Sequence, residues 1–148
     1  MDYHALRDGL AAALPYNAHL GLEVIEVGPS RGVVRLPDAS HLHNHVGTQH
    51  AGGLFSAAEA ASGAAFVGAF AERMGEITPL ARSTSIEYLT LARGPITATG
   101  ILEEDPARLR QRLDGEDQVQ FPVQVVLEDE RGATVARVTV DWHVRKRT

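Results

Sequence analysis

The chain has 148 residues, a formal net charge of −5 and no cysteine. A chain of this length fits one domain, so we expect a single domain over residues 1–148. The lack of cysteine excludes disulfide frameworks, thiolate nucleophiles and cysteine-ligated metal sites. The acidic balance argues against a nucleic-acid partner, whose backbone attracts a positive surface. No basic segment precedes an apolar core at the N-terminus, and we expect no membrane span and a cytoplasmic location.

The first third of the chain predicts a short helix and a hairpin. Apolar residues at helical spacing indicate a leading helix within residues 1–14, which Pro15 is expected to stop. Residues 20–27 and 33–36 have strand character, and the Gly- and Pro-containing segment 28–32 between them predicts a turn.

The segment from Ala51 to Ala71 is apolar almost all round, which is typical of a buried helix, and we expect it to end near Met74. Its only charged residue is Glu59. Glutamate is almost never fully buried without a partner, so Glu59 requires an explanation. It is either a functional carboxylate or a structural one, held across a subunit interface or paired with Arg82.

The remaining chain predicts four strands, over residues 81–91, 96–102, 119–128 and 133–144. Between the second and third lies the polar segment 104–118. It contains a potential short helix capped by Asp105, but its charge pattern favours a solvated surface excursion. The order of elements implies an α+β fold, an antiparallel sheet of about six strands wrapped around one long helix. One helix covers only one face of the sheet, so we expect at least a dimer.

The loop before the long helix is rich in histidine, at positions 41, 43, 45 and 50. Alternate residues of an extended segment point to one side, so a metal site is one interpretation. The pattern is weak because no cysteine is available and the nearest acids, Asp38 and Glu59, have other uses. We therefore expect no metal.

The segment Asn44-x-x-Gly47-Thr48-x-His50-x-Gly52, with Glu59 nine residues after the histidine, resembles the hotdog-fold acyl-CoA thioesterases. Within that superfamily it is similar to the phenylacetate-pathway group and most similar to an uncharacterised branch. The resemblance covers about residues 15–145 and implies the hotdog fold. It also implies hydrolysis of an acyl-CoA, with coenzyme A as part of the substrate and no other cofactor.

The resemblance further implies residue roles. Glu59 would be the general base or nucleophile, with Asn44 and His50 as further catalytic residues. The backbone N–H groups of Ala51 and Gly52 would polarise the thioester carbonyl at the helix start. Ser62 and Ser83 would contact substrate. The expected assembly is a homodimer, or a dimer of dimers, with Glu59 and Asn44 contributed by different subunits.

Two departures keep alternatives open. Ala51 stands where many relatives have glycine, and Ala81 falls where some relatives place an early-strand Ser or Thr. These departures motivate a second hypothesis, a dimer that binds an acyl chain or acyl-CoA without hydrolysing it. A third, weaker one is hydration of an enoyl-CoA.

Overall fold

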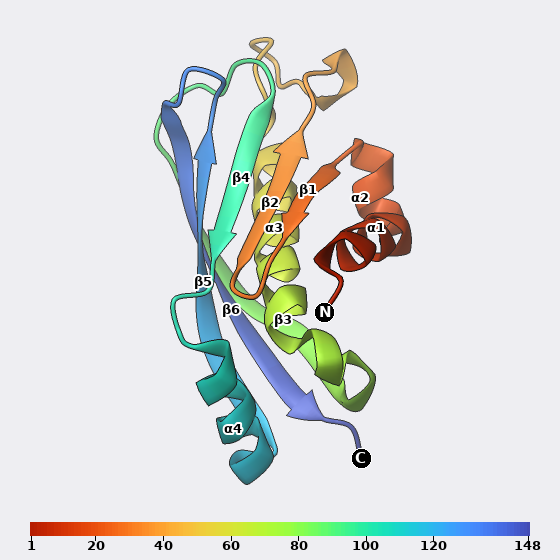
Figure 1. Ribbon diagram of the computed structural model, residues 1–148. Helices are drawn as coiled ribbons and strands as arrows, with labels where there is room; N and C mark the ends of the chain where they lie inside the picture. The colour runs from red at the N-terminus through yellow and green to blue at the C-terminus, as the bar shows by residue number, and fades with distance from the viewer.

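The computed structural model describes all residues from Met1 to Thr148. Figure 1 shows one long helix against a single curved sheet, with short helices beside the long helix and at the lower end of the sheet. The helices are α1 (Tyr3–Ala13), α2 (Pro15–Leu20), α3 (Ala51–Phe70) and α4 (Pro106–Glu116), and the short 3-10 turns are η1 (Ser40–Leu42) and η2 (Ala71–Glu76). The strands are β1 (Glu23–Val27), β2 (Arg31–Leu36), β3 (Ile77–Tyr88), β4 (Ile96–Ile101), β5 (Gln118–Glu128) and β6 (Thr134–Lys146).

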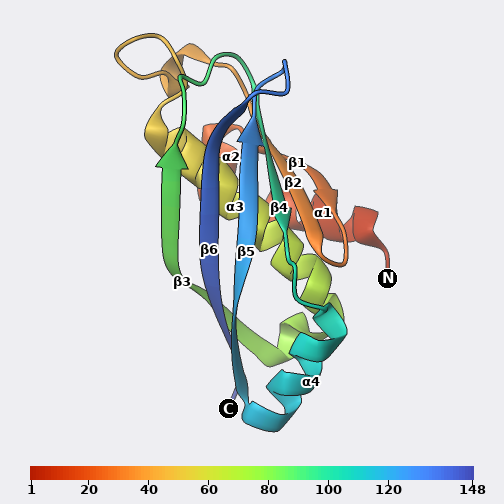
Figure 2. The ribbon, with the colours of Figure 1, turned by 90° about the vertical axis from the view of Figure 1, so that its left-hand side faces the viewer.

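All six strands form one antiparallel sheet in the order β1-β2-β4-β5-β6-β3. Figure 2 shows α3 crossing behind this sheet, with β1 and β3 at its two edges. The predicted α+β architecture, six antiparallel strands wrapped around one long helix, is therefore confirmed.

The core lies between α3 and the sheet, and it explains the composition of α3. Fourteen of the 20 residues of this helix are buried, most of them alanine or glycine. Phe66 stacks on Trp142 of β6 with ring centroids 5.2 Å apart. By length and composition α3 with η2 is apolar enough to cross a membrane, but 72% of its most apolar window is buried inside the fold. Packing against its own sheet accounts for that apolar character.

Small residues let α3 approach the sheet closely. A Cβ atom at Gly68 of α3 would lie 1.7 Å from the carbonyl oxygen of Gly28, in the β1–β2 turn. No side chain fits in that space, because the obstructing atom belongs to the backbone. Gly63, five residues earlier on the same helix, has room, since its nearest foreign atom would be Trp142 Cζ2 at 3.8 Å.

These two glycines give a matched test of the packing. We expect Gly68→Ala to lower the free energy of unfolding by about 3 kcal/mol or more, because either the helix or the β1–β2 turn must move. Gly63→Ala should raise it by about 0.5–1 kcal/mol, because alanine loses less entropy than glycine in a helix. Denaturant unfolding of both variants measures the difference. Equal stabilities would contradict the close packing of α3 on the turn.

The N-terminal region contains two helices rather than the single predicted one. α1 begins as expected, with the Asp2 carboxylate accepting hydrogen bonds from the N–H groups of His4 and Ala5. Pro15 ends α1 but also opens α2, in the first turn of a helix where its missing N–H costs nothing. The predicted end of the leading helix before Pro15 is therefore confirmed, and α2 is an additional helix that the sequence did not predict. Figures 1 and 2 place α1 and α2 on the side of α3 away from β5 and β6.

The segment 104–118 is not a solvated excursion, because most of it forms α4. Asp105 caps this helix as predicted, accepting a hydrogen bond from the N–H of Ala107. Leu109 and Leu113, one turn apart, are both fully buried. The charged residues that suggested a surface loop occupy only the outer side of an amphipathic helix.

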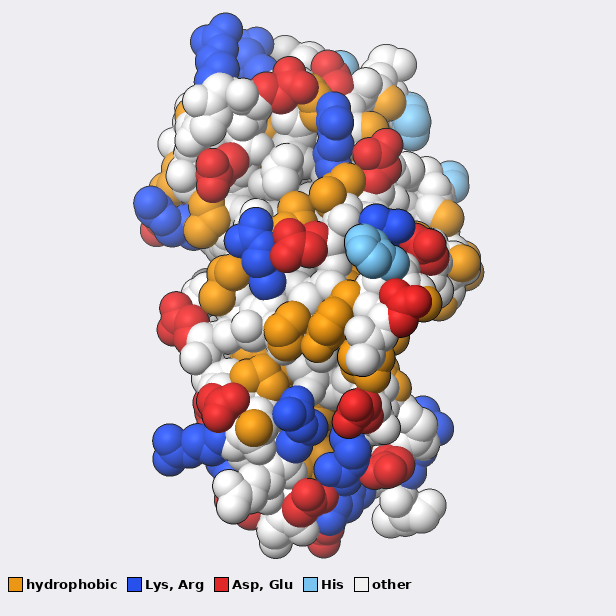
Figure 3. All heavy atoms as spheres, in the orientation of Figure 1, with side chains coloured by type: hydrophobic (Ala, Val, Ile, Leu, Met, Phe, Trp, Pro, Cys, Tyr) orange, Lys and Arg blue, Asp and Glu red, His pale blue; other side chains and the backbone are white.

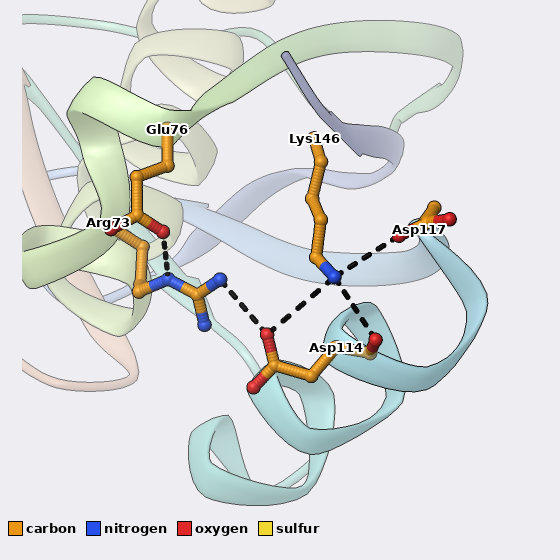
Figure 4. Close-up of polar contacts among 5 residues, drawn as sticks. All are labelled: Arg73, Glu76, Asp114, Asp117 and Lys146. Carbon is orange, nitrogen blue, oxygen red and sulfur yellow. Dashed lines mark hydrogen bonds and ion pairs between the residues drawn. The ribbon is translucent and has the colours of Figure 1, made fainter. Parts of the chain in front are cut away.

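Ion pairs fix α4 to the end of α3 and to the last residues of β6 (Figure 4). Arg73 of η2 donates to Glu76 at 2.6 Å and to Asp114 of α4 at 2.9 Å. Lys146 donates to the Asp117 carboxylate and to the Asp114 carbonyl, each at 3.0 Å. The bond from Arg73 lowers the pKa of Asp114. The carboxylates are exposed and the two cations are partly exposed, so these ion pairs align the elements more than they stabilise them.

β3 begins four residues earlier than predicted, at Ile77. Pro79 precedes the strand predicted over residues 81–91 but lies inside β3, opposite Val144 of β6. Because β3 is an edge strand, a residue without an N–H is tolerated there. A β-bulge interrupts its pairing with β6 between Ala81 and Ser83.

Candidate functional site

An apolar groove of about 340 Å³ opens on the side of α3 that the sheet does not cover. The helices α1 and α2 form one wall, α3 forms the floor, and residues of η2, β3 and β6 complete the opposite side. Its lining residues are Leu10, Leu14, Pro15, Tyr16, Asn17, Glu59, Ala60, Gly63, Phe66, Val67, Met74, Pro79 and Trp142. The largest well-formed apolar pocket with a few polar groups is the default place to look for a ligand site.

Glu59 is the only carboxylate in this groove. Its side chain is half-buried, and burial raises the pKa of the carboxyl above the ordinary 4.5. Burial is the only cause of that shift, with no positive neighbour to oppose it. The ion pair with Arg82 considered from the sequence is not formed, because Arg82 is exposed on β3 and has no salt bridge. Perturbed carboxyls in clefts are candidates for acid–base chemistry.

The backbone beneath Glu59 is held by a buried hydrogen-bond chain. Trp142 Nε1 donates to Ser62 Oγ at 3.2 Å, and that hydroxyl donates to the Glu59 carbonyl at 2.7 Å. Ser62 has no exposed surface, so it lies below the groove floor rather than on it. Both hydrogen-bond partners of Ser62 belong to the protein itself. Of the two side chains in this hydrogen-bond chain, only Trp142 lines the groove.

The start of α3 presents a different set of groups. His50 is the N-cap, and its Nδ1 accepts a hydrogen bond from the Gly52 N–H at 2.8 Å. The N–H of Ala51 has no acceptor within the chain, and Ala51 is exposed. Tyr88 of β3 donates to the Ala51 carbonyl at 3.1 Å. Of the two N–H groups expected to bind a carbonyl oxygen, Ala51 is open and Gly52 is occupied by His50.

Asn44 organises the loop that leads into α3. Its side-chain oxygen accepts from the N–H groups of Val46 and Thr48, at 3.1 and 3.0 Å. Its amide nitrogen donates to Thr48 Oγ1 at 2.8 Å and to the Gln49 carbonyl at 3.3 Å. The whole amide is thus used inside the loop, and Asn44 does not line the groove that contains Glu59.

Gln49 and Tyr16 are two polar residues at this site that sequence analysis missed. Gln49 is 3% exposed and donates from Nε2 to the carbonyls of Pro37 and Gly94, both at 2.9 Å, which ties the loop to the ends of β2 and β4. The Tyr16 hydroxyl lies 3.2 Å from Ser56 Oγ, at the groove. Nothing in the local sequence indicates either role, because the partners lie 12 to 45 residues away.

Ser83 lies away from the groove. It pairs with Asp141 of β6, to which its hydroxyl donates at 3.1 Å. The neighbouring pair, Thr84 and Val140, points to the opposite face, because side chains alternate along a strand and Val140 is fully buried. Thr84 is therefore a β3 hydroxyl on the α3 side of the sheet, as is Tyr88, whose hydroxyl reaches the Ala51 carbonyl. The bulge before it obscures this alternation in the sequence.

Glu59 and Ala51 are on one helix, eight residues apart. At about 1.5 Å per residue, their backbones are separated by ~12 Å along the axis. One carbonyl group within a single chain cannot reach both the Ala51 N–H and the Glu59 carboxylate. Joint action of these two groups requires a second copy of the chain.

Charged side chains of both signs are intermixed over the face seen in Figure 3, without a continuous basic surface. Arginine side chains commonly bind phosphate groups such as those of coenzyme A, but two arginines of α4 have structural partners here. Arg110 donates to the Ala69 carbonyl at the end of α3, and Arg112 donates to Glu104 at 2.8 Å. In the histidine-rich loop, His43 Nε2 lies 2.6 Å from the Asp38 carboxylate.

Comparison with known proteins identifies the family and the fold. Residues 4–144 match the model of a domain of unknown function, DUF4442. No protein of curated function matches the sequence. Among solved structures, a Pseudomonas aeruginosa protein of unknown function, described as a probable thioesterase, is 23% identical, with 97% of this chain and 95% of that chain covered and a TM-score of 0.87.

Two other solved structures show the same arrangement. A protein of unknown function from Chlorobaculum tepidum is 14% identical over 97% of this chain and 94% of its own, with a TM-score of 0.84. A thioesterase family protein from Silicibacter pomeroyi is 18% identical over 96% of both chains, with a TM-score of 0.76. These likenesses establish the hotdog fold. Because the family model covers nearly the whole chain, the protein belongs to the DUF4442 family.

Proposed function

We propose that the protein is a thioester hydrolase that cleaves an acyl-CoA to a free acid and a thiol. The observation that carries the proposal is Glu59, an unpaired carboxylate of raised pKa in an apolar groove. The description of structural neighbours as thioesterases supports the same reaction class. The motif's resemblance to phenylacetate-pathway thioesterases supports the individual roles.

In the proposed reaction Glu59 removes a proton from water as the water adds to the thioester carbonyl, the C–S bond then breaks, and the departing thiolate takes up that proton. If Glu59 instead attacks the carbonyl directly, the C–S bond breaks as an anhydride forms, and water then hydrolyses the anhydride to the free acid and regenerates Glu59. The Ala51 N–H stabilises the negative charge that develops on the carbonyl oxygen. It is favourably placed for this, because the start of a helix attracts negative charge. His50 and Asn44 act as positioning residues: His50 caps α3, and Asn44 holds the preceding loop.

We propose a homodimer in which Glu59 of one chain works with the Ala51 N–H of the other. The ~12 Å separation along α3 supports this arrangement. The unpaired edge of β3, 12 residues long, supports it as well, because exposed strand edges tend to pair. Leu80 on this strand is 59% exposed, and Leu91 beyond its end is 54% exposed.

Binding without hydrolysis is the second candidate, and one observation favours it. The Gly52 N–H and the Asn44 amide, two groups expected to assist the reaction, have partners within the chain. Such a protein would hold the acyl group in the groove and leave the thioester intact. Thiol release from a panel of acyl-CoAs, measured beside calorimetry with a non-hydrolysable thioether analogue, separates the two. Binding without release would favour the second candidate.

The pH dependence of turnover tests the role of Glu59. A base must be ionised, and burial raises the pKa of Glu59 above 4.5. We therefore expect kcat/KM to rise with pH through a midpoint above that value, with a slope of one proton on the acid side. A midpoint at or below the ordinary glutamate pKa would contradict the assignment of Glu59 as the base.

A further inference from the structure

We propose that the groove beneath α1 and α2 is the acyl-chain pocket, and that it accepts an uncharged, apolar acyl group of medium length. This inference rests on the proposed function and adds the class of acyl group to it. Nothing in the motif around His50 indicates this pocket, because one wall comes from α1 and α2, which precede that motif in the chain.

The position of Glu59 defines how the substrate is oriented in the groove. Along the floor, the lining residues of α3 run from Glu59 through Gly63 to Val67, which is ~12 Å of helix. The reacting thioester lies at the Glu59 end, so the acyl chain extends toward Val67 and Met74. With C–C bonds of about 1.5 Å, a chain of about eight to ten carbons spans that distance.

The chemistry of the lining defines the acyl group. No lysine, arginine or histidine is among the 13 lining residues, and Glu59 is the only acidic one. A carboxylate or phosphate on the acyl chain would therefore be buried without a counter-charge, which is unfavourable. Leu10, Phe66 and Val67 favour a hydrocarbon instead.

The wall formed by α2 is anchored beside the reacting end. Ser56 Oγ donates its hydrogen to the Gly52 carbonyl at 2.9 Å. The Tyr16 hydroxyl lies 3.2 Å from Ser56 Oγ and is therefore the donor in the hydrogen bond between Tyr16 and Ser56. Ser56 precedes Glu59 by three residues, less than one helical turn. This bond joins α2 to α3 within one helical turn of the carboxylate.

The test measures the affinity of S-alkyl-CoA thioethers from ethyl to dodecyl for the full chain by calorimetry. We expect Kd to fall roughly fourfold per methylene, the effect of burying each one, until the groove is full at about eight to ten carbons. Beyond that length Kd should stop falling. Val67→Trp, which fills the end of the groove far from Glu59, should move this break in the plot of Kd against chain length to shorter chains. A matched control, Ala71→Trp, places the same side chain four residues further on and outside the groove, and should leave the break unchanged.

A Kd that does not depend on chain length, or a break that Val67→Trp does not move, would overturn the pocket. This result is independent of catalysis, because the thioethers cannot be hydrolysed. If the affinities follow the expected pattern but acyl-CoAs are not cleaved, the proposed hydrolase activity fails and the acyl pocket stands. A thioether with a terminal carboxylate gives a further check, since it should bind more weakly than the alkyl chain of equal length.

Discussion

Replacing Glu59 with glutamine is expected to reduce kcat/KM for the best acyl-CoA by roughly 10²–10⁴-fold, the usual contribution of a positioned general base. Glutamine has nearly the same shape but cannot accept a proton from water. Because Glu59 reaches the groove from a helix packed on the sheet, the substitution leaves the core unchanged. Steady-state thiol release measures the loss, and calorimetry with an alkyl-CoA thioether should show that binding persists.

The same variant should be more stable than the wild type at neutral pH. The folded-state pKa of Glu59 is raised, so the folded protein holds this proton more tightly than the unfolded chain does. Stability attributable to Glu59 is present below the ordinary pKa of 4.5 and is lost as pH rises through the raised value. The Tm advantage of Glu59→Gln should therefore exist at pH 7 and shrink toward pH 4. A purely structural carboxylate with a partner across an interface would give the opposite sign at pH 7.

Replacing Ala51 with proline is expected to reduce kcat/KM by roughly 10²–10³-fold, the effect of losing one oxyanion donor. Ala51 is the first residue of α3, where proline is favoured, and His50 before it has the extended conformation that proline requires. The variant thus loses an N–H group and keeps the helix. Ala51→Gly is the matched control, because it retains the N–H and should retain activity.

Mixing the two inactive variants tests the shared site. If each site combines Glu59 of one chain with the Ala51 N–H of the other, a dimer of Glu59→Gln with Ala51→Pro contains one complete site. Unfolding and refolding an equal mixture should then restore roughly a quarter of wild-type activity, since half of the dimers are mixed and each has one of two sites intact. Recovery no greater than the sum of the separate variants would show that the two groups do not act together across a dimer.

The fold could be predicted because periodicity determines it. The apolar segment from Ala51, the turns and the alternating strands all contain local patterns, and the structure follows them. The errors arise where local patterns compete with tertiary packing. Leu109 and Leu113 have helical spacing, but the charges around them suggested a loop. Pro79 suggested a strand boundary, but the edge position of β3 tolerates it.

The site could be predicted only in part. Glu59 stands out because a carboxylate in an apolar helix is unusual whatever surrounds it. The groove could not be predicted, because it depends on how α1 and α2 pack beside α3. The Tyr16 contact with Ser56 joins residues 40 positions apart. For Asn44 and Ser62, the residue types allowed either ligand contact or internal hydrogen bonding, and only tertiary neighbours distinguish these roles.

We propose that this protein hydrolyses acyl thioesters through Glu59. The most direct measurement is the amount of coenzyme A thiol released from octanoyl-CoA per mole of protein, for the wild type and Glu59→Gln at the same pH. We expect many turnovers for the wild type and, over the same time, release near the uncatalysed background for the variant. Equal release by the two proteins, or none by a wild type that binds the octyl thioether, would contradict it.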